Sequence, residues 1–223
     1  MDLDDLARRA GGLVPTGSAG RAILGICGPP GAGKTTLVEE LLRRLRARHG
    51  PEWAAHVPMD GFHLADVQLR RLGLADRKGA PETFDADGYA AILGRIATGR
   101  DRVVYAPGFE RELEQPIAAA IAVPPEAQII LTEGNYLLLE EPAWAAARSW
   151  MSEVWYVDLD PATRVERLIG RHVRFGKAPA RAREWVLRSD EANARLVEGS
   201  RGRADLVITA ARTLDRLPGT WQG

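Results

Sequence analysis

The segment Gly28-Pro-Pro-Gly-Ala-Gly-Lys-Thr35 has the residue types and spacing of a phosphate-binding loop. It fits the pattern G-x-x-x-x-G-K-[ST] at every fixed position. Its glycines let successive backbone N–H groups face one point, and the following helix adds its positive N-terminal end. Lys34 can reach the β- and γ-phosphates, and the Thr35 hydroxyl can ligate Mg²⁺. The sequence therefore predicts a nucleoside triphosphate site, with binding residues Gly28, Pro29, Pro30, Gly31, Ala32, Gly33, Lys34, Thr35 and Thr36.

Two acidic residues are expected close to this loop. Glu133 follows the apolar run Ile129–Thr132, and Asp60 follows a second predicted strand. Ligands of an open parallel sheet bind beyond the carboxyl ends of its strands, where both side chains would lie. Glu133 can hold Mg²⁺ through water, and Asp60 can either accept a proton from an attacking hydroxyl group or bind the metal. Each residue can also be a helix cap or a turn residue, because Asp before Gly is common in turns.

Short apolar runs alternate with amphipathic stretches, and this alternation positions the two acidic residues and the loop. Strands are predicted at 21–27, 54–59, 102–105, 128–132, 153–158 and 205–209. Helices are predicted at 2–10, from Lys34 to about Gly50, at 85–98, from Asp160 onward and at 180–197. Strands that alternate with helices predict an α/β fold with a parallel sheet and crossover helices. Together with the phosphate-binding loop, they predict a P-loop NTPase three-layer fold, with a central, mostly parallel sheet flanked by helices and a helical lid.

Composition narrows the class of protein further. The chain has 223 residues, and 30 Lys and Arg balance 30 Asp and Glu. No overall positive field would attract a polyanion, so we expect no nucleic-acid partner. The N-terminus is acidic, no apolar stretch approaches the length of a membrane-spanning helix, and the single cysteine, Cys27, cannot form an intramolecular disulfide. We therefore expect a cytoplasmic protein without a membrane partner, with residues 1–20 as an N-terminal extension and 21–223 as a single domain.

A basic helix is predicted after Asp160-Pro161. Four arginines are spaced so that they lie along one helical face: Arg164, Arg167, Arg171 and Arg174. Such a face is often simply solvated. The functional alternative is a lid, approximately 171–185, that closes over a nucleotide and brings Arg171 and Arg174 against the transferring phosphoryl group. On the next helix, Asp190 and Asn193 share a face with apolar residues, which favours inward hydrogen bonding to a substrate or to a loop.

Four blocks of the chain occur in the order found in a known group of kinases. They are Gly28–Thr36, Met59-Asp-Gly-Phe-His63, Arg77-Lys-Gly-Ala-Pro-Glu-Thr-Phe-Asp85 and Thr132-Glu-Gly-Asn-Tyr136. With them the chain resembles the phosphoribulokinase, uridine kinase and pantothenate kinase superfamily of P-loop kinases, over roughly residues 20 to 210. It is most similar to the bacterial nucleoside/nucleotide kinase-like branch, also labelled fructose-transport-associated kinases. Members of this branch carry Asp-Gly-Phe-His and a later His-x-x-x-Gly-Lys stretch, here His172–Lys177.

The resemblance implies an enzyme that uses ATP and Mg²⁺ to phosphorylate a hydroxyl group of a small metabolite, such as a sugar, a nucleoside or a pantothenate-like alcohol. It implies Asp60 as the base. The residues themselves add Lys34, Arg171 and Arg174 as expected catalytic residues, and Thr35, Glu133 and Asp60 as expected ligands of the metal. The expected contacts of the acceptor are His63, Arg77, Lys78, Phe84, Arg111, Tyr136, Asp190 and Asn193.

Two other functions are compatible with the phosphate-binding loop. One is a P-loop NTPase that acts as a switch on a protein partner, which the Asp60 block disfavours. The other is a nucleotide-binding module without catalysis, which the presence of Lys34, Thr35, Asp60 and Glu133 disfavours. A homodimer is compatible with the sequence, and the identity of the acceptor stays open.

Overall fold

A parallel sheet forms the centre of the molecule. The computed structural model describes residues 1–17, 20–99, 101–210 and 213. Within that part of the chain, the sheet has five strands in the order β2-β5-β1-β6-β7, and every neighbouring pair is parallel. The strands are β1 (Ala22–Cys27), β2 (Ala54–His56), β5 (Ile129–Gly134), β6 (Glu153–Asp158) and β7 (Leu206–Thr209). The predicted α/β class with a central parallel sheet is confirmed.

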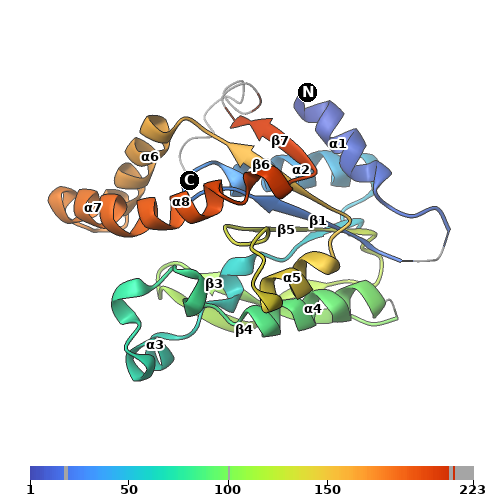
Figure 1. Cartoon of the computed structure of the whole chain (residues 1–223). Coiled ribbons are helices and arrows are strands. Elements are labelled where there is room, and N and C mark those ends of the chain that lie inside the picture. Colours follow the sequence, from blue (N-terminus) through green and yellow to red (C-terminus); the bar gives the residue numbers. More distant parts are fainter. Residues whose placement is uncertain (18–19, 100, 211–212, 214–223) are drawn as a thin grey trace.

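Helices cover both faces of this sheet (Figure 1). The described helices are α1 (Leu3–Gly12), α2 (Lys34–His49), α3 (Asp66–Leu72), α4 (Ala86–Thr98), α5 (Pro142–Ser149), α6 (Pro161–Arg174), α7 (Pro179–Trp185) and α8 (Glu191–Glu198), of which α3 lies away from the sheet. In the part of the chain that is described, none of them combines the length and the apolarity needed to cross a bilayer.

The period-2 geometry of the strands divides the core into two layers. In β1, Ile23 and Cys27 face a cluster that contains Tyr89 of α4 and Trp144 of α5. The alternate residues of β1 face a second cluster, which contains the leucines of α1 and α2. Because β1 and β5 are buried along their whole length, they form a rigid base for the residues that follow them.

A long segment joins the paired strands β2 and β5 and carries much of the structure outside the central sheet. It contains the 3₁₀-helical turns η1 (Met59–Phe62), η2 (Ala75–Arg77) and η3 (Pro81–Thr83), together with α3 and α4. It also contains an antiparallel hairpin of β3 (Val104–Glu110) and β4 (Gln115–Val123). The strand predicted at 102–105 is therefore the beginning of this hairpin and lies outside the parallel sheet.

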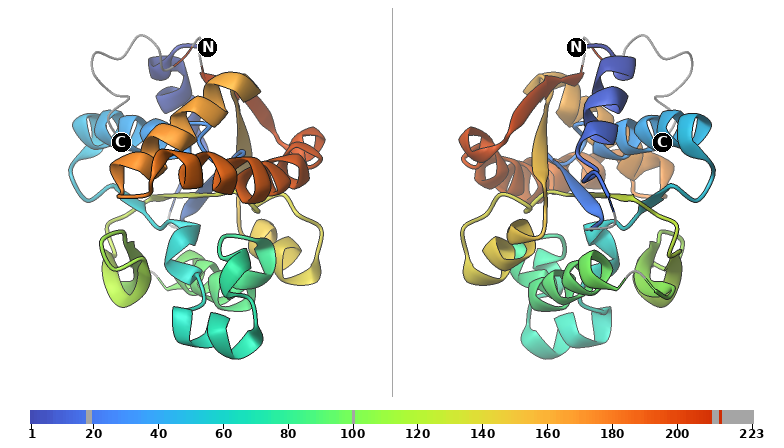
Figure 2. Two further views of the ribbon diagram at one scale, coloured as in Figure 1. Left: turned by 90° about the vertical axis from the view of Figure 1, so that its left-hand side faces the viewer. Right: turned by 90° about the vertical axis from the view of Figure 1, so that its right-hand side faces the viewer.

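Two other predicted elements differ from the structure. The strand predicted at 54–59 ends at His56, because Pro58 is followed by η1. The helix predicted at 180–197 consists of α7, a π-helical turn η4 (Val186–Asp190) and α8. These three elements form one continuous helical rod beside α6 (Figure 2). The hairpin strand β4 and the helices α3 and α5 were not predicted.

Candidate active site

The segment Gly28–Thr35 connects the buried strand β1 to the first turn of α2, as its sequence predicts. Gly28 and Gly31 have φ values of 149° and 80°. A Cβ atom at Gly28 would lie 2.6 Å from the Val157 carbonyl oxygen, and one at Gly31 would lie 2.8 Å from Cγ of Leu168 on α6. Only glycine fits both positions, because a side chain would collide with β6 or α6. The loop is therefore held tightly between the sheet and α6.

Lys34 is the first residue of α2 and is 8% exposed. Its Nζ donates to the carbonyl oxygens of Gly28 at 3.0 Å and Pro29 at 3.1 Å, and to Oδ1 of Asn135 at 2.7 Å. Burial lowers the pKa of Lys34, and the negative charges of Glu133 and Asp60 oppose this effect. The ammonium group is thus fixed over the loop. Asn135 was not predicted as a site residue, although it lies two positions after Glu133.

Glu133 lies in β5, beside β1, and is 6% exposed. Its Oε1 accepts a hydrogen bond of 3.1 Å from the Thr35 hydroxyl. Burial raises the pKa of Glu133, and the nearby charge of Asp60 adds to the increase, while Lys34 opposes it. Two oxygen ligands of the kind that Mg²⁺ prefers therefore lie next to each other at the end of the phosphate loop.

Asp60 lies in η1, four residues after β2 ends. Arg111, at the tip of the hairpin, places Nη2 at 3.9 Å from Asp60 Oδ2. The hairpin packs tightly on η1, because a Cβ atom at Gly61 would lie 2.3 Å from the Pro107 carbonyl oxygen. The charge of Asp60 influences the pKa values of both Lys34 and Glu133, so its carboxylate belongs to the same electrostatic environment as the loop.

Aromatic side chains surround the region next to Asp60. His63 Nδ1 lies 2.8 Å from the Asp60 carbonyl oxygen, and the His63 ring is 4.0 Å from Phe84 and 4.9 Å from Phe109, centroid to centroid. Burial lowers the pKa of His63, which favours the neutral ring. Tyr136 contacts Phe84 edge-on and donates its hydroxyl hydrogen to the Gly79 carbonyl oxygen.

The predicted cations Arg77 and Lys78 form ion pairs within their own segment. Arg77 pairs with Glu82 at 2.6 Å and is 59% exposed. Lys78 Nζ lies 2.8 Å from Asp66 Oδ1 and also donates to the Glu114 carbonyl oxygen. Of the cations expected to contact the acceptor, Arg111 is the one that the structure brings next to Asp60.

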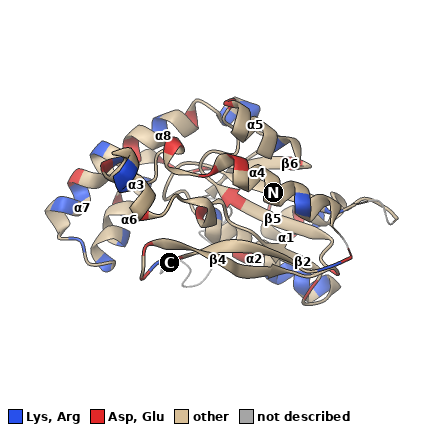
Figure 3. Cartoon of the chain, turned by 90° about the horizontal axis from the view of Figure 1, so that it is seen from below, with Lys and Arg blue, Asp and Glu red and all other residues tan. Residues whose placement is uncertain are grey.

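The arginines of α6 have different surroundings. Arg164 is 1% exposed and pairs with Glu191 of α8 at 2.6 Å, so it joins two helices. Arg171 lies in the last turn of α6 and is half-buried, and its positive charge adds to the lowering of the Lys34 pKa. Arg174 is exposed at the end of the helix. Lys and Arg recur along α6 and α7 in Figure 3.

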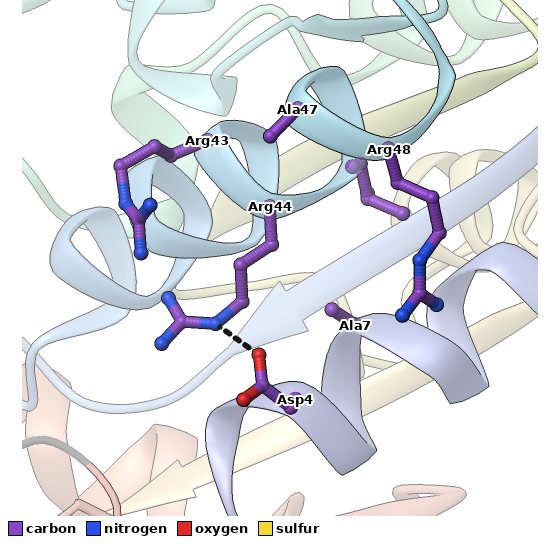
Figure 4. A pocket seen from close by; sticks show the side chains of 7 residues that line it. Asp4, Ala7, Arg43, Arg44, Ala47 and Arg48 are labelled. Atoms are coloured by element: carbon purple, nitrogen blue, oxygen red, sulfur yellow. Dashed lines mark hydrogen bonds and ion pairs between the residues drawn. The ribbon is translucent and has the colours of Figure 1, made fainter.

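A pocket between α1 and α2 has a different character (Figure 4). It is lined by Asp4, Ala7, Arg43, Arg44, Leu45, Ala47 and Arg48. Arg43 and Arg44 pair with Glu40, and Arg44 also lies 2.9 Å from Asp4. These ion pairs neutralise two of the three arginines. The pocket lies along the second half of α2, whereas the phosphate loop precedes the first residue of that helix.

The parallel sheet, the glycine loop at its carboxyl edge and the adjacent Lys34, Thr35 and Glu133 define the P-loop class of nucleotide-binding proteins. Comparison with known proteins narrows the class further. No protein-family model matches the chain. It is 32% identical to "Putative uridine kinase C227.14" of Schizosaccharomyces pombe, covering 86% of this chain and 84% of that protein. It is 31% identical to "ATP-dependent kinase-like protein notR'" of Aspergillus versicolor, covering 74% of this chain and 95% of that protein.

A solved structure of a protein described as a kinase is also similar to this chain. The crystal structure described as a "putative fructose transport system kinase" from Silicibacter sp. TM1040 superposes with a TM-score of 0.84 at 35% identity. The superposition covers 93% of this chain and 99% of that one. The chain therefore belongs to the uridine kinase-like family of P-loop kinases, and it is a phosphotransferase.

Proposed function

We propose that the chain transfers the γ-phosphoryl group of ATP to a hydroxyl group of a small metabolite, such as a sugar, a nucleoside or a pantothenate-like alcohol. The observation that carries this proposal is the shared electrostatic environment of the three charged residues at the phosphate loop. The Asp60 carboxylate shares one environment with the phosphate-loop Lys34 and the buried Glu133. Phosphoryl transfer needs a charge-neutralising cradle and a base that faces it, and little further covalent chemistry from the protein.

The nucleotide half of the site consists of residues 28–36. Backbone N–H groups of the loop bind the phosphates, and Lys34 compensates the charge of the β- and γ-phosphates. The Thr35 hydroxyl and the Glu133 carboxylate, which are 3.1 Å apart, fit Mg²⁺, which proteins often hold through one or two such ligands together with substrate phosphates. The metal supplies neutralisation of phosphate charge when it is bound. Among the described residues no cluster of three His, Cys, Asp or Glu offers an alternative metal site.

Asp60 is the proposed base of the reaction. Its carboxylate takes the proton of the acceptor hydroxyl as the hydroxyl oxygen attacks the γ-phosphorus, and ADP leaves with the electrons of the broken P–O bond. Arg111, whose Nη2 lies 3.9 Å from Asp60 Oδ2, binds any anionic substituent of the acceptor. The neutral His63 ring is the proposed packing surface for the acceptor, and the buried rings of Phe84 and Tyr136 lie behind it. Arg77, Lys78, Asp190 and Asn193 are the remaining proposed contacts.

Arg171 and Arg174 are the proposed lid residues. Both are carried by α6, whose Leu168 packs against Gly31 of the phosphate loop. A guanidinium group that approaches the transferring phosphoryl group stabilises charge that develops in the transition state. We also propose a cytoplasmic location and a homodimer, the second of which sedimentation of the purified protein tests directly.

Acceptor-stimulated ADP release tests the proposed function. The purified protein is screened with Mg·ATP across sugars, nucleosides and vitamin alcohols, with release of ADP coupled to a spectrophotometric signal. One class of acceptor is expected to raise the rate above that of ATP alone. Asp60→Asn is expected to abolish this stimulation while ATP binding is retained. Turnover that no acceptor changes, together with a stable complex with another protein, would instead support the switch function.

A further inference from the structure

His172, near the end of α6, connects two charged groups from different elements. Its Nε2 lies 3.0 Å from Oδ2 of Asp190 in the π-helical turn, and its Nδ1 lies 3.2 Å from Nζ of Lys177 in the loop after α6. An ammonium group can only donate, so Nδ1 accepts and the ring hydrogen is on Nε2, which donates to Asp190. The ring of His172 therefore holds the end of α6, the following loop and the π-helical turn together.

The other contacts of these groups make this arrangement compact. The side chains of His172 and Asp190 are each only 14% exposed. Lys177 also lies over the ring of Trp185, with Nζ at 5.6 Å from the centroid. π-Helical turns within α-helices occur frequently at functional sites, and this one places Asp190 at its end, facing back toward α6.

A second connection leads from the same helical rod to the acceptor side of the site. Asn193, three residues after Asp190, donates through Nδ2 to the Gly79 carbonyl oxygen at 3.3 Å. The same carbonyl oxygen accepts the hydroxyl hydrogen of Tyr136. Gly79 begins the segment 79–83, in which its N–H donates to Thr83 Oγ1 at 3.0 Å. Asn193 and Tyr136 are thus joined through a single carbonyl group.

We propose that His172 is a positioning residue that couples nucleotide binding at the phosphate loop to the acceptor segment 79–83. The route runs from Gly31 through α6 to His172, then through Asp190 and the helical rod to Asn193 and Gly79. A nucleotide that draws α6 toward the loop shifts His172, and the shift reaches Gly79 because each contact along the route is a direct one. This inference rests on the proposed function, since it assigns the segment 79–83 to the acceptor.

Hydrogen–deuterium exchange with the probe Mg·AMP-PNP tests this coupling without any acceptor. In the wild-type protein the probe is expected to slow exchange in residues 28–36, in 171–190 and also in 79–83, the last by at least about fivefold. In His172→Ala the slowing in 28–36 persists and that in 79–83 is lost. His172→Gln, which keeps a donor directed at Asp190, restores it. Glu184→Gln, which removes an exposed ion pair with Arg181 on the same lid, leaves the wild-type pattern unchanged.

Three outcomes would overturn the inference. The first is a wild-type protein in which the probe does not slow exchange in 79–83. The second is a His172→Ala variant with the full wild-type pattern. The third concerns the case in which His172→Ala also loses the slowing in 28–36. Asn193→Ala is then measured instead, and the inference fails if the probe still slows exchange in 79–83 of that variant. Because no acceptor is used, a screen that finds no acceptor would overturn the proposed function and leave this result intact.

Discussion

The ion pair between α6 and α8 allows a quantitative test of how the lid is anchored. Arg164 is 1% exposed, and its Nη2 lies 2.6 Å from Glu191 Oε1, whose side chain is 21% exposed. Arg164→Met keeps the apolar stem but leaves Glu191 without its partner. Removal of one member of a buried pair costs about 3–5 kcal/mol, and we expect about 3 kcal/mol because Glu191 retains contact with water. For a domain of this size, this loss lowers Tm by about 6–12 °C.

Thermal and urea denaturation of the wild type, Arg164→Met and the double variant Arg164→Met/Glu191→Leu measure this contribution. The double variant is the matched control, because replacing both charged partners by apolar residues of similar volume is often neutral. It is expected to recover most of the stability that the single variant loses. If the single variant lost less than about 1 kcal/mol, the ion pair would contribute no more than an exposed one. If the double variant were no more stable than the single one, an unpaired Glu191 would not be the cause of the loss.

Three further predictions concern individual residues. Burial lowers the pKa of His56 from 6.5 to about 4. As the pH falls, the unfolded state therefore binds a proton before the folded state does. The stability contributed by the neutral ring is complete above pH 6.5 and is lost as the pH falls toward 4. His56→Gln should remove this acid limb, worth up to about 3 kcal/mol, from a plot of stability against pH, and an unchanged plot would contradict the assignment. Burial raises the pKa of Glu133 above its ordinary value of 4.5. The charged carboxylate therefore lowers the free energy of unfolding at neutral pH, and this loss disappears below pH 4.5, where Glu133 is protonated in both the folded and the unfolded state. Glu133→Gln should raise Tm at pH 8, give no such increase in acid, and abolish phosphoryl transfer. Gly31→Ala should destabilise the protein by about 1–3 kcal/mol and weaken ATP binding in calorimetry, because its φ is 80° and its Cβ would lie 2.8 Å from Leu168 Cγ, whereas Gly170→Ala, with nothing within 4 Å, should be neutral or stabilising.

Local sequence signals were sufficient for the nucleotide half of the site. The spacing of Gly28, Gly33, Lys34 and Thr35 is short, and the loop conformation depends on the backbone freedom of its glycines. The position of Glu133 followed from the apolar run before it, because a strand buried on both faces has a nearly continuous run of apolar residues. These features are encoded within a few residues of one another, so no long-range contact had to be known.

Features that depend on distant partners could not be predicted. Arg164 has the same helical spacing as Arg171 and Arg174, and only the position of Glu191, 27 residues later, makes it a buried anchor. The strand β4 contains a run of alanines and a proline, which have little intrinsic preference for a strand, and forms because it pairs with β3. The partners of Lys78, which are Asp66 and the Glu114 carbonyl oxygen, likewise could not be predicted from the sequence around it.

The position of the long segment between β2 and β5 has a consequence for the proposed site. The two strands are neighbours in the sheet, so the chain leaves the sheet after β2 and returns to it at the adjacent strand β5, with residues 57–128 between them. They include Asp60, His63, Phe84 and Arg111, while the phosphate loop and Glu133 lie outside them. Under the proposed function, a change confined to this one contiguous stretch would alter the proposed base and several of the proposed acceptor contacts, while the phosphate loop and Glu133 would keep their sequence.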